Sequence, residues 1–146
     1  MTTLDIGTGL YLEEDFLHLL SQDIEKANQE GRPYTVIAVV PQHLPGEGID
    51  DIIDVAANCL RAFLRDDDLG GRLDGEALAM GLPDTDATEA KVVSYRLQGD
   101  LRLRSFHLRN TVWEPGIATL GEDGSTAQEL VAAAIEAALS RRRRLG

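Results

Sequence analysis

Hydrophobic residues in the first part of the chain follow a helical period, then a strand-like run, then a helical period again. Over Leu12–Glu30 they recur every three or four residues, which predicts an amphipathic helix that Gly31 and Pro33 end. Tyr34–Val40 is a short apolar run rich in β-branched residues, typical of a buried central strand. The spacing over Ile49–Leu64 predicts a second amphipathic helix.

A hairpin is predicted next. Two short strands, Leu69–Leu73 and Ala77–Leu82, flank the pair Asp74–Gly75. An Asp-Gly pair readily supplies the positive φ angles that a tight hairpin requires. We therefore expect these two strands to pair antiparallel.

The region after the hairpin is predicted to hold a helix and two strands. Asp86 followed three residues later by Glu89 resembles a capping box, which opens a helix over Ala87–Gln98. Leu101–Val112 has a strand-like, irregular alternation, and Gly116–Leu120 is a further short strand.

A final helix is predicted at the C-terminal end. Ser125 and Gln128 form a second capping box, and the helix runs through Leu139 into the arginine run Arg141–Arg144. Residues 141–146 are expected to be a basic tail. The run suits a solvated helix end, where cations offset the helix dipole, better than a phosphate, nucleic-acid or acidic-partner contact.

The order of elements and the composition together predict one α+β domain over residues 1–146, with helices packed on a mainly antiparallel sheet of about five strands. The chain has 25 acidic and 14 basic residues and a formal charge of −11. So acidic a surface argues against nucleic-acid and anionic-membrane binding. No apolar run approaches the roughly 20 residues of a membrane span, and the N-terminus does not resemble a secretory signal. We expect a cytoplasmic protein without membrane insertion.

Histidine and cysteine give no sign of a metal or nucleophile site. His18, His43 and His107 are far apart in sequence and lack ligand spacing. The lone Cys59 lies beside an apolar helix face and is expected to be a core residue. Trp113 is expected to be a packing anchor. No cofactor is predicted.

Several segments, in order and spacing, resemble the GGDEF (diguanylate cyclase) family over nearly the whole chain. The start Asp5-Ile6-Gly7-Thr8-Gly9-Leu10-Tyr11 is similar to that family's D-x-x-T-G-L-x-N. Arg65-Asp66-Asp67-Asp68-Leu69, then Arg72-Leu73-Asp74-Gly75-Glu76-Ala77-Leu78, is similar to R-x-x-D-L and R-Y-G-G-D-E-F. Leu82-Pro83-Asp84-Thr85-Asp86 matches L-P-D-T-D, and Val112–Ala118 resembles V-T-V-S-I-G-V-A. The resemblance implies the family's fold.

The family's reaction joins two GTP molecules into cyclic di-GMP, with divalent metals held by carboxylates from the first core strand and the signature hairpin. The matching strand positions here are Val40 and Gln42, neither of which is an acid. The segment that matches the signature is Asp74, Gly75, Glu76, Ala77 and Leu78. It keeps the second glycine, as Gly75, and the third-position acid, as Glu76. Ala77 replaces the glutamate, and Asp74 replaces a glycine. Asp50 matches the guanine-contacting acid, after a shortened loop.

These departures predict a catalytically inactive member of the family, with no catalytic residue and no metal. We expect a regulatory module that acts through protein–protein contacts, with a protein partner, an adjoining sensor domain or a second copy. In the family, the turn matched by Asp5 and Thr8 couples an upstream sensory segment to the domain. An active cyclase with rearranged metal ligands is the third hypothesis.

A second hypothesis is a cyclic di-GMP receptor. Arg65 and Asp68 match the family's R-x-x-D inhibitory site, and Arg61 and Arg72 are expected to lie near enough to help. A guanidinium and a carboxylate suit a guanine edge or a phosphate. The structural alternative is that Arg65 ends its helix and pairs with Asp66–Asp68.

Overall fold

The computed structural model describes residues 4–5, 8–42, 49–74, 76–105 and 112–145. For Gln42, Ile49, Asp50, Val112 and 141–145 the description covers the backbone alone. The elements, in chain order, are β1 (Tyr11–Leu12), α1 (Glu13–Glu30), β2 (Tyr34–Gln42), α2 (Ile49–Phe63), β3 (Leu69–Arg72), β4 (Leu78–Pro83), α3 (Ala87–Arg104), β5 (Val112–Thr119) and α4 (Ala127–Leu145).

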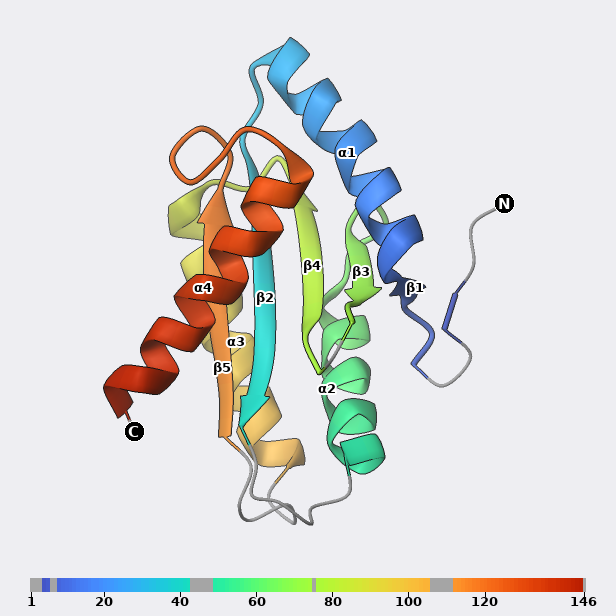
Figure 1. The fold of residues 1–146 in the computed structure, drawn as a ribbon, viewed down its shortest axis with the longest axis vertical. Coiled ribbons are helices and arrows are strands. Elements are labelled where there is room, and N and C mark those ends of the chain that lie inside the picture. Colours follow the sequence, from blue (N-terminus) through green and yellow to red (C-terminus); the bar gives the residue numbers. More distant parts are fainter. Residues whose placement is uncertain (1–3, 6–7, 43–48, 75, 106–111, 146) are drawn as a thin grey trace.

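The strands form one five-stranded sheet in the order β1-β3-β4-β2-β5 (Figure 1). Every neighbouring pair is antiparallel except β1 with β3, which is parallel. The α+β architecture and the mainly antiparallel sheet expected from the sequence are therefore confirmed. No helix in the described ranges is long and apolar enough to cross a bilayer.

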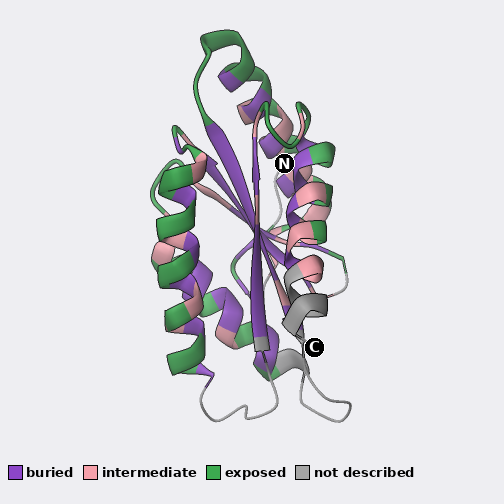
Figure 2. Cartoon of the chain, turned by 90° about the vertical axis from the view of Figure 1, so that its left-hand side faces the viewer, coloured by how far each residue is buried: buried purple, intermediate pink, exposed green. Residues whose placement is uncertain are grey.

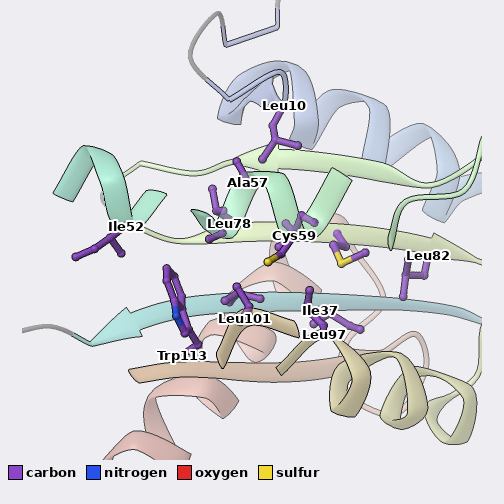
Figure 3. Close-up of a cluster of buried hydrophobic side chains, with 14 of the residues drawn as sticks. Leu10, Ile37, Ile52, Ala57, Cys59, Leu78, Leu82, Leu97, Leu101 and Trp113 are labelled. Carbon is purple, nitrogen blue, oxygen red and sulfur yellow. The ribbon is translucent and has the colours of Figure 1, made fainter. Parts of the chain in front are cut away.

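The core lies on both faces of the sheet because successive residues of the central strand β2 point to opposite sides. Ile37 and Val39 join α2 and α3 in one cluster, shown in Figure 3. Val36 and Ala38 join α1 and α4 in the other. Figure 2 shows the layers edge-on, with buried residues along the sheet and exposed residues on the outer sides of the helices.

Several local predictions are confirmed. Gly31 adopts a left-handed conformation (φ 66°) and ends α1. The strands β3 and β4 pair as a hairpin, and both halves of the Asp86–Glu89 capping box are present at the start of α3. Cys59 is buried. Trp113 is also buried, and its Nε1 donates to the Ser105 hydroxyl at 2.9 Å.

The predicted strand Leu101–Val112 is wrong. Leu101 and its neighbours to Arg104 continue α3, residues 106–111 lie outside the described residues, and Val112 begins β5. The predicted strand Gly116–Leu120 is the second half of that longer strand. Pro115 lies inside β5, which tolerates it because β5 is at the sheet edge and one side of its backbone has no ladder to join.

Two predicted helix boundaries also differ. The capping contacts at the start of α4 use Glu129 in place of the expected Gln128. The Glu129 N–H donates to the Thr126 hydroxyl at 3.2 Å, and Ser125 bonds the Glu129 carboxylate. The backbone of α4 is helical to Leu145, through the residues expected to be a tail.

Candidate functional site

The segment before α1 is tied to the signature hairpin through one carboxylate. Asp5 Oδ2 accepts hydrogen bonds from the Thr8 hydroxyl at 2.7 Å and from Arg72 Nη1 at 3.0 Å. These donors lower the pKa of Asp5, the Thr8 hydroxyl contributing most and Arg72 next. Thr8 and Leu10 are buried, so this turn is part of the packed structure.

A pair of carboxyl groups lies where the hairpin loop meets the start of α1. The Leu73 N–H donates to the Ala77 carbonyl at 2.9 Å and closes the hairpin. Asp74 is exposed, and its hydrogen bond with the Glu13 side chain raises the pKa of Glu13. The two side chains would repel if both were ionised, and Glu13 therefore holds its proton more tightly. Two acidic side chains thus lie where the hairpin meets the start of α1.

Apolar side chains occupy the positions beside the hairpin. Ala77 is 9% exposed and belongs to the cluster between the sheet and α1 and α4. Val40, half-buried, packs against the same cluster. Leu78 is buried on the opposite face of the sheet.

Arg65 and Asp68 form a closed pair at the loop between α2 and β3. Arg65 Nε and Nη2 each donate to the Asp68 carboxylate at 3.1 Å, and the Arg65 backbone N–H donates to Asp68 Oδ2 at 2.8 Å. The Asp68 side chain is only 1% exposed, whereas that of Arg65 is 63% exposed. Arg65 Nη2 also donates to the Thr85 hydroxyl at 3.0 Å, so the pair is anchored to the end of β4.

This pair borders a cavity of about 240 Å³. Its other lining residues are Phe63, Leu82, Thr85, Glu89, Val93 and Arg96. Its volume lies below the roughly 300–1,000 Å³ of pockets that enclose a drug-sized ligand, so it suits one ring of a nucleotide better than a whole dinucleotide. Glu89 and Arg96, both on α3, were missed by the sequence reasoning.

A protein-family model matches nearly the whole sequence of this chain. The model for the GGDEF domain, described as diguanylate cyclase, matches residues 2–145. The chain belongs to the GGDEF family. The family suspected from the signature residues is thus confirmed. No curated protein matches the chain in sequence.

Solved GGDEF structures share the fold of this domain. The FimX GGDEF domain from Pseudomonas aeruginosa superposes with a TM-score of 0.84 at 21% identity, over 99% of this chain and 96% of that one. The diguanylate cyclase SiaD from the same organism, in complex with its activator SiaC, gives 0.83 at 22% identity over 97% of this chain. This chain spans 58% of the SiaD chain. DgcB from Caulobacter crescentus, a coiled coil and GGDEF domain in complex with c-di-GMP, gives 0.80 at 19% identity, over 97% and 81% of the two chains.

The structure brings together some of the residues that the GGDEF signature predicts at the site. Asp74, Glu76, Ala77 and Leu78 lie in or beside the hairpin loop, and Val40 lies near the end of β2. Gly75 and the side chains of Gln42 and Asp50 lie outside the described residues. The residues present do not fit the divalent ions of a cyclase, since valine and alanine offer no oxygen donor. In the described part of the chain, no three His, Cys, Asp or Glu side chains cluster as metal ligands.

Arg61 and Arg72 were expected to assist Arg65 and Asp68, but both contact the N-terminal segment instead. Arg72 bonds Asp5. Arg61 bonds Asn58 and packs on Gly9, where an added Cβ would lie 2.7 Å from Arg61 Nη1. Beside the Arg65–Asp68 pair, the cavity is lined by Arg96 of α3.

Proposed function

We propose that this GGDEF domain is a catalytically inactive regulatory module of cyclic di-GMP signalling that acts through protein–protein contacts. One observation carries the proposal. Val40 and Ala77, at the positions that match a metal-binding acid and the catalytic glutamate, pack into the same apolar cluster. Two GTP molecules need their phosphate charge neutralised, and hydrocarbon side chains supply nothing for that purpose.

The charges near the hairpin support the same proposal. Asp74 replaces a glycine of the signature, and Glu13 contacts it. A triphosphate that approached this loop would meet two acidic side chains, which repel it. The proposal keeps the cytoplasmic setting expected from the sequence.

Product analysis tests the inactivity directly. We expect the purified chain, incubated with GTP and Mg²⁺ or Mn²⁺, to yield no cyclic di-GMP by chromatography, while an active cyclase in the same buffer does. Product that scales with the concentration of the chain would refute the proposal. A Val40→Asp/Ala77→Glu variant, assayed in parallel, tests whether those two positions alone prevent the synthesis of cyclic di-GMP.

A cyclic di-GMP receptor is the second candidate, and the cavity beside Arg65 and Asp68 favours it. Arg96 lines this cavity, so two guanidinium groups border it. Against it, the closed Arg65–Asp68 pair already uses both carboxylate oxygens. Calorimetric titration with cyclic di-GMP tests the receptor candidate. Binding lost in Arg65→Ala and Arg96→Ala but kept in Arg104→Ala, on the same helix, supports a receptor, and no heat at high micromolar ligand excludes it.

A further inference from the structure

The outer side of α3 combines apolar exposure with positive charge. Of the five exposed large hydrophobic residues in the described part of the chain, three lie on this helix: Val92 at 50%, Tyr95 at 82% and Leu103 at 79% exposure. The buried residues of α3 are Ala90, Ser94, Leu97 and Leu101. At 3.6 residues per turn, the exposed three lie on the side opposite these buried residues and face outward.

Gly99 forms a notch in this outer side. It lies one turn from Tyr95 and one turn from Leu103, in opposite directions along the helix. An added Cβ would meet nothing within 4 Å, so the space above Gly99 is open. Because a large apolar side chain stands at each end of that space, a protruding side chain of another helix can enter it and contact both. We call Val92, Tyr95, Gly99 and Leu103 the outer stripe.

Basic side chains flank the outer stripe on both sides. Lys91 and Arg102 are exposed and eleven residues apart, which is three helical turns, so they lie along the same flank. Arg96, also exposed, lies on the other flank. Among the described residues, none of these three cations forms an ion pair, although several cations of the chain do pair with an acid: Arg32, Arg65, Arg72 and Arg104. The outer side of α3 is thus locally basic on a chain of formal charge −11.

The two acids on this side of α3 are engaged within their own helix. Arg104 Nε donates to Asp100 at 2.8 Å. Glu89 accepts the Asp86 backbone N–H at 3.2 Å as part of the capping box. A second copy that docked through the same stripe would add its own three cations and no acid to match them, and like charges repel. Charge complementarity therefore favours an acidic occupant from another protein.

We propose that the outer stripe is a docking surface for an acidic amphipathic helix of a partner protein. The apolar side of that helix covers Val92, Tyr95 and Leu103, with one large side chain above Gly99. Its flanking Asp and Glu side chains face Lys91 and Arg102 on one side. Exposed tyrosine and arginine side chains are the types that contribute most at the centres of protein interfaces.

An anionic membrane is a less suitable occupant of the same surface. A helix that lies in a membrane interface buries a broad apolar side, whereas the outer stripe holds only three large apolar residues, with Gly99 between two of them. A membrane is also an extended negative plane, which repels the rest of an acidic chain, whereas a single helix contacts α3 alone. The proposal rests on the proposed function, because it names the chemistry of the partner through which an inactive module acts.

Fluorescence anisotropy with two synthetic peptides tests the surface in the full chain. The first peptide has 18 residues, the length of α3, with leucine every third or fourth residue and glutamate at the flanking positions. The second keeps the leucines and carries lysine in place of glutamate. We expect the glutamate peptide to bind about tenfold more tightly than the lysine peptide, and added salt to reduce this difference.

Substitutions in α3 separate the apolar and the electrostatic contributions. Tyr95→Ala and Gly99→Leu should each weaken binding of the glutamate peptide about tenfold, since one removes an anchor and the other fills the notch. The thermal midpoint of Gly99→Leu should be unchanged or higher, because leucine suits a helix and the site is open. Lys91→Glu/Arg102→Glu should reverse the preference and favour the lysine peptide.

Matched controls lie on α1, which covers the opposite face of the sheet from α3 (Figure 1). Lys26→Glu makes the same charge change at an exposed cation of α1, and Gln29→Leu adds the same side chain at an exposed position there. Both should bind the glutamate peptide as the wild-type chain does. Equal weakening in a control and in its α3 counterpart would overturn the assignment to the outer stripe.

Several results would overturn the proposal outright. These are no binding of the glutamate peptide, equal binding of the two peptides, or a preference that Lys91→Glu/Arg102→Glu leaves unchanged. Sedimentation with phosphatidylserine vesicles that Tyr95→Ala abolishes, without peptide binding, would assign the surface to a membrane. A dimer that Gly99→Leu dissociates, again without peptide binding, would assign it to a second copy.

The GTP assay and the peptide assay fail independently of each other. Synthesis of cyclic di-GMP by a chain that binds the glutamate peptide would refute the inactivity and leave the docking surface in place. An inactive chain that binds neither peptide would refute the docking surface alone.

Discussion

Arg72, the last residue of β3 in the signature hairpin, donates a hydrogen bond of 3.0 Å to Asp5 in the turn before α1. The two residues are far apart in sequence, and the side chains are only 34% and 19% exposed. The contact joins the N-terminal segment directly to the hairpin, and Thr8 holds the same carboxylate. A displacement of this segment would therefore be transmitted to the end of β3, beside the hairpin loop.

Loss of the Asp5 carboxylate should destabilise the fold in a pH-dependent way. We expect Asp5→Asn to lower the free energy of unfolding by about 0.5–1 kcal/mol at pH 7. Because Thr8 and Arg72 lower the pKa of Asp5 in the folded state, its contribution is present above the ordinary carboxyl pKa and is lost as pH falls through the lowered value. Urea unfolding at several pH values measures the difference.

The difference between wild type and Asp5→Asn should thus be constant from pH 7 to pH 5 and shrink below about pH 4, near the ordinary aspartate pKa. Asp54→Asn, an exposed acid of α2, is the control and should stay within about 0.5 kcal/mol of wild type. A difference between wild type and Asp5→Asn that grows toward acid pH would contradict the role assigned to this carboxylate.

Removal of the Arg65 side chain and removal of the Asp68 side chain should lower the unfolding free energy by different amounts. Arg65 is largely exposed, so Arg65→Ala should cost roughly 0–1 kcal/mol of unfolding free energy. The side chain of Asp68 is buried and also accepts the Arg65 backbone N–H, so Asp68→Ala should cost about 1–3 kcal/mol. Denaturant titrations of both variants check this order. Equal costs would mean that the backbone contact contributes little.

The fold was predictable in segments where the hydrophobic residues follow one clear spacing, either helical or strand-like. The helical spacing of Phe16, Leu20 and Ile24 predicts α1, and the mostly apolar, β-branched run at the start of β2 predicts a strand. Leu101 and Leu103 alternate with arginines and were therefore interpreted as strand. In the structure Leu101 is buried one turn after Leu97, whereas Leu103 is exposed. Local alternation does not reveal which leucine meets the core.

The candidate site was predictable only where the signature is contiguous in sequence. The hairpin residues and the Arg65–Asp68 pair came from such runs. Glu89 and Arg96 reach the same cavity from α3, and only the packing of this helix against α2 brings them there. The available signal was weak: Glu89, Val93 and Arg96 share one side of a helix, which charged surface residues often do. Arg61 was close in sequence yet packs on Gly9.

The acidic pair at the hairpin should make a small unfavourable contribution at neutral pH. Asp74 raises the folded-state pKa of Glu13, so stability present below the ordinary glutamate pKa is lost as pH rises through the raised value. We expect Asp74→Asn to raise the unfolding free energy by about 0.3 kcal/mol at pH 7, a small figure because the site is largely exposed to solvent. The gain should vanish near pH 4, and Glu25→Gln on the outer side of α1 is the control. A loss of stability in Asp74→Asn would contradict the repulsion.

Gly116 should be among the least replaceable residues, because α4 lies directly on β5 at this point. An added Cβ would lie 2.0 Å from the Ala134 carbonyl oxygen and 2.4 Å from the Ala138 nitrogen, both of them backbone atoms that no rotamer change can move. Gly116→Ala must displace α4 from the sheet, at a cost of about 3 kcal/mol of unfolding free energy. Gly99→Ala, the same change at an open helical position, should instead add about 0.5–1 kcal/mol. Thermal and urea unfolding of the two variants should therefore shift in opposite directions, and a well-tolerated Gly116→Ala would mean that α4 is less closely packed than its contacts with Ala134 and Ala138 require.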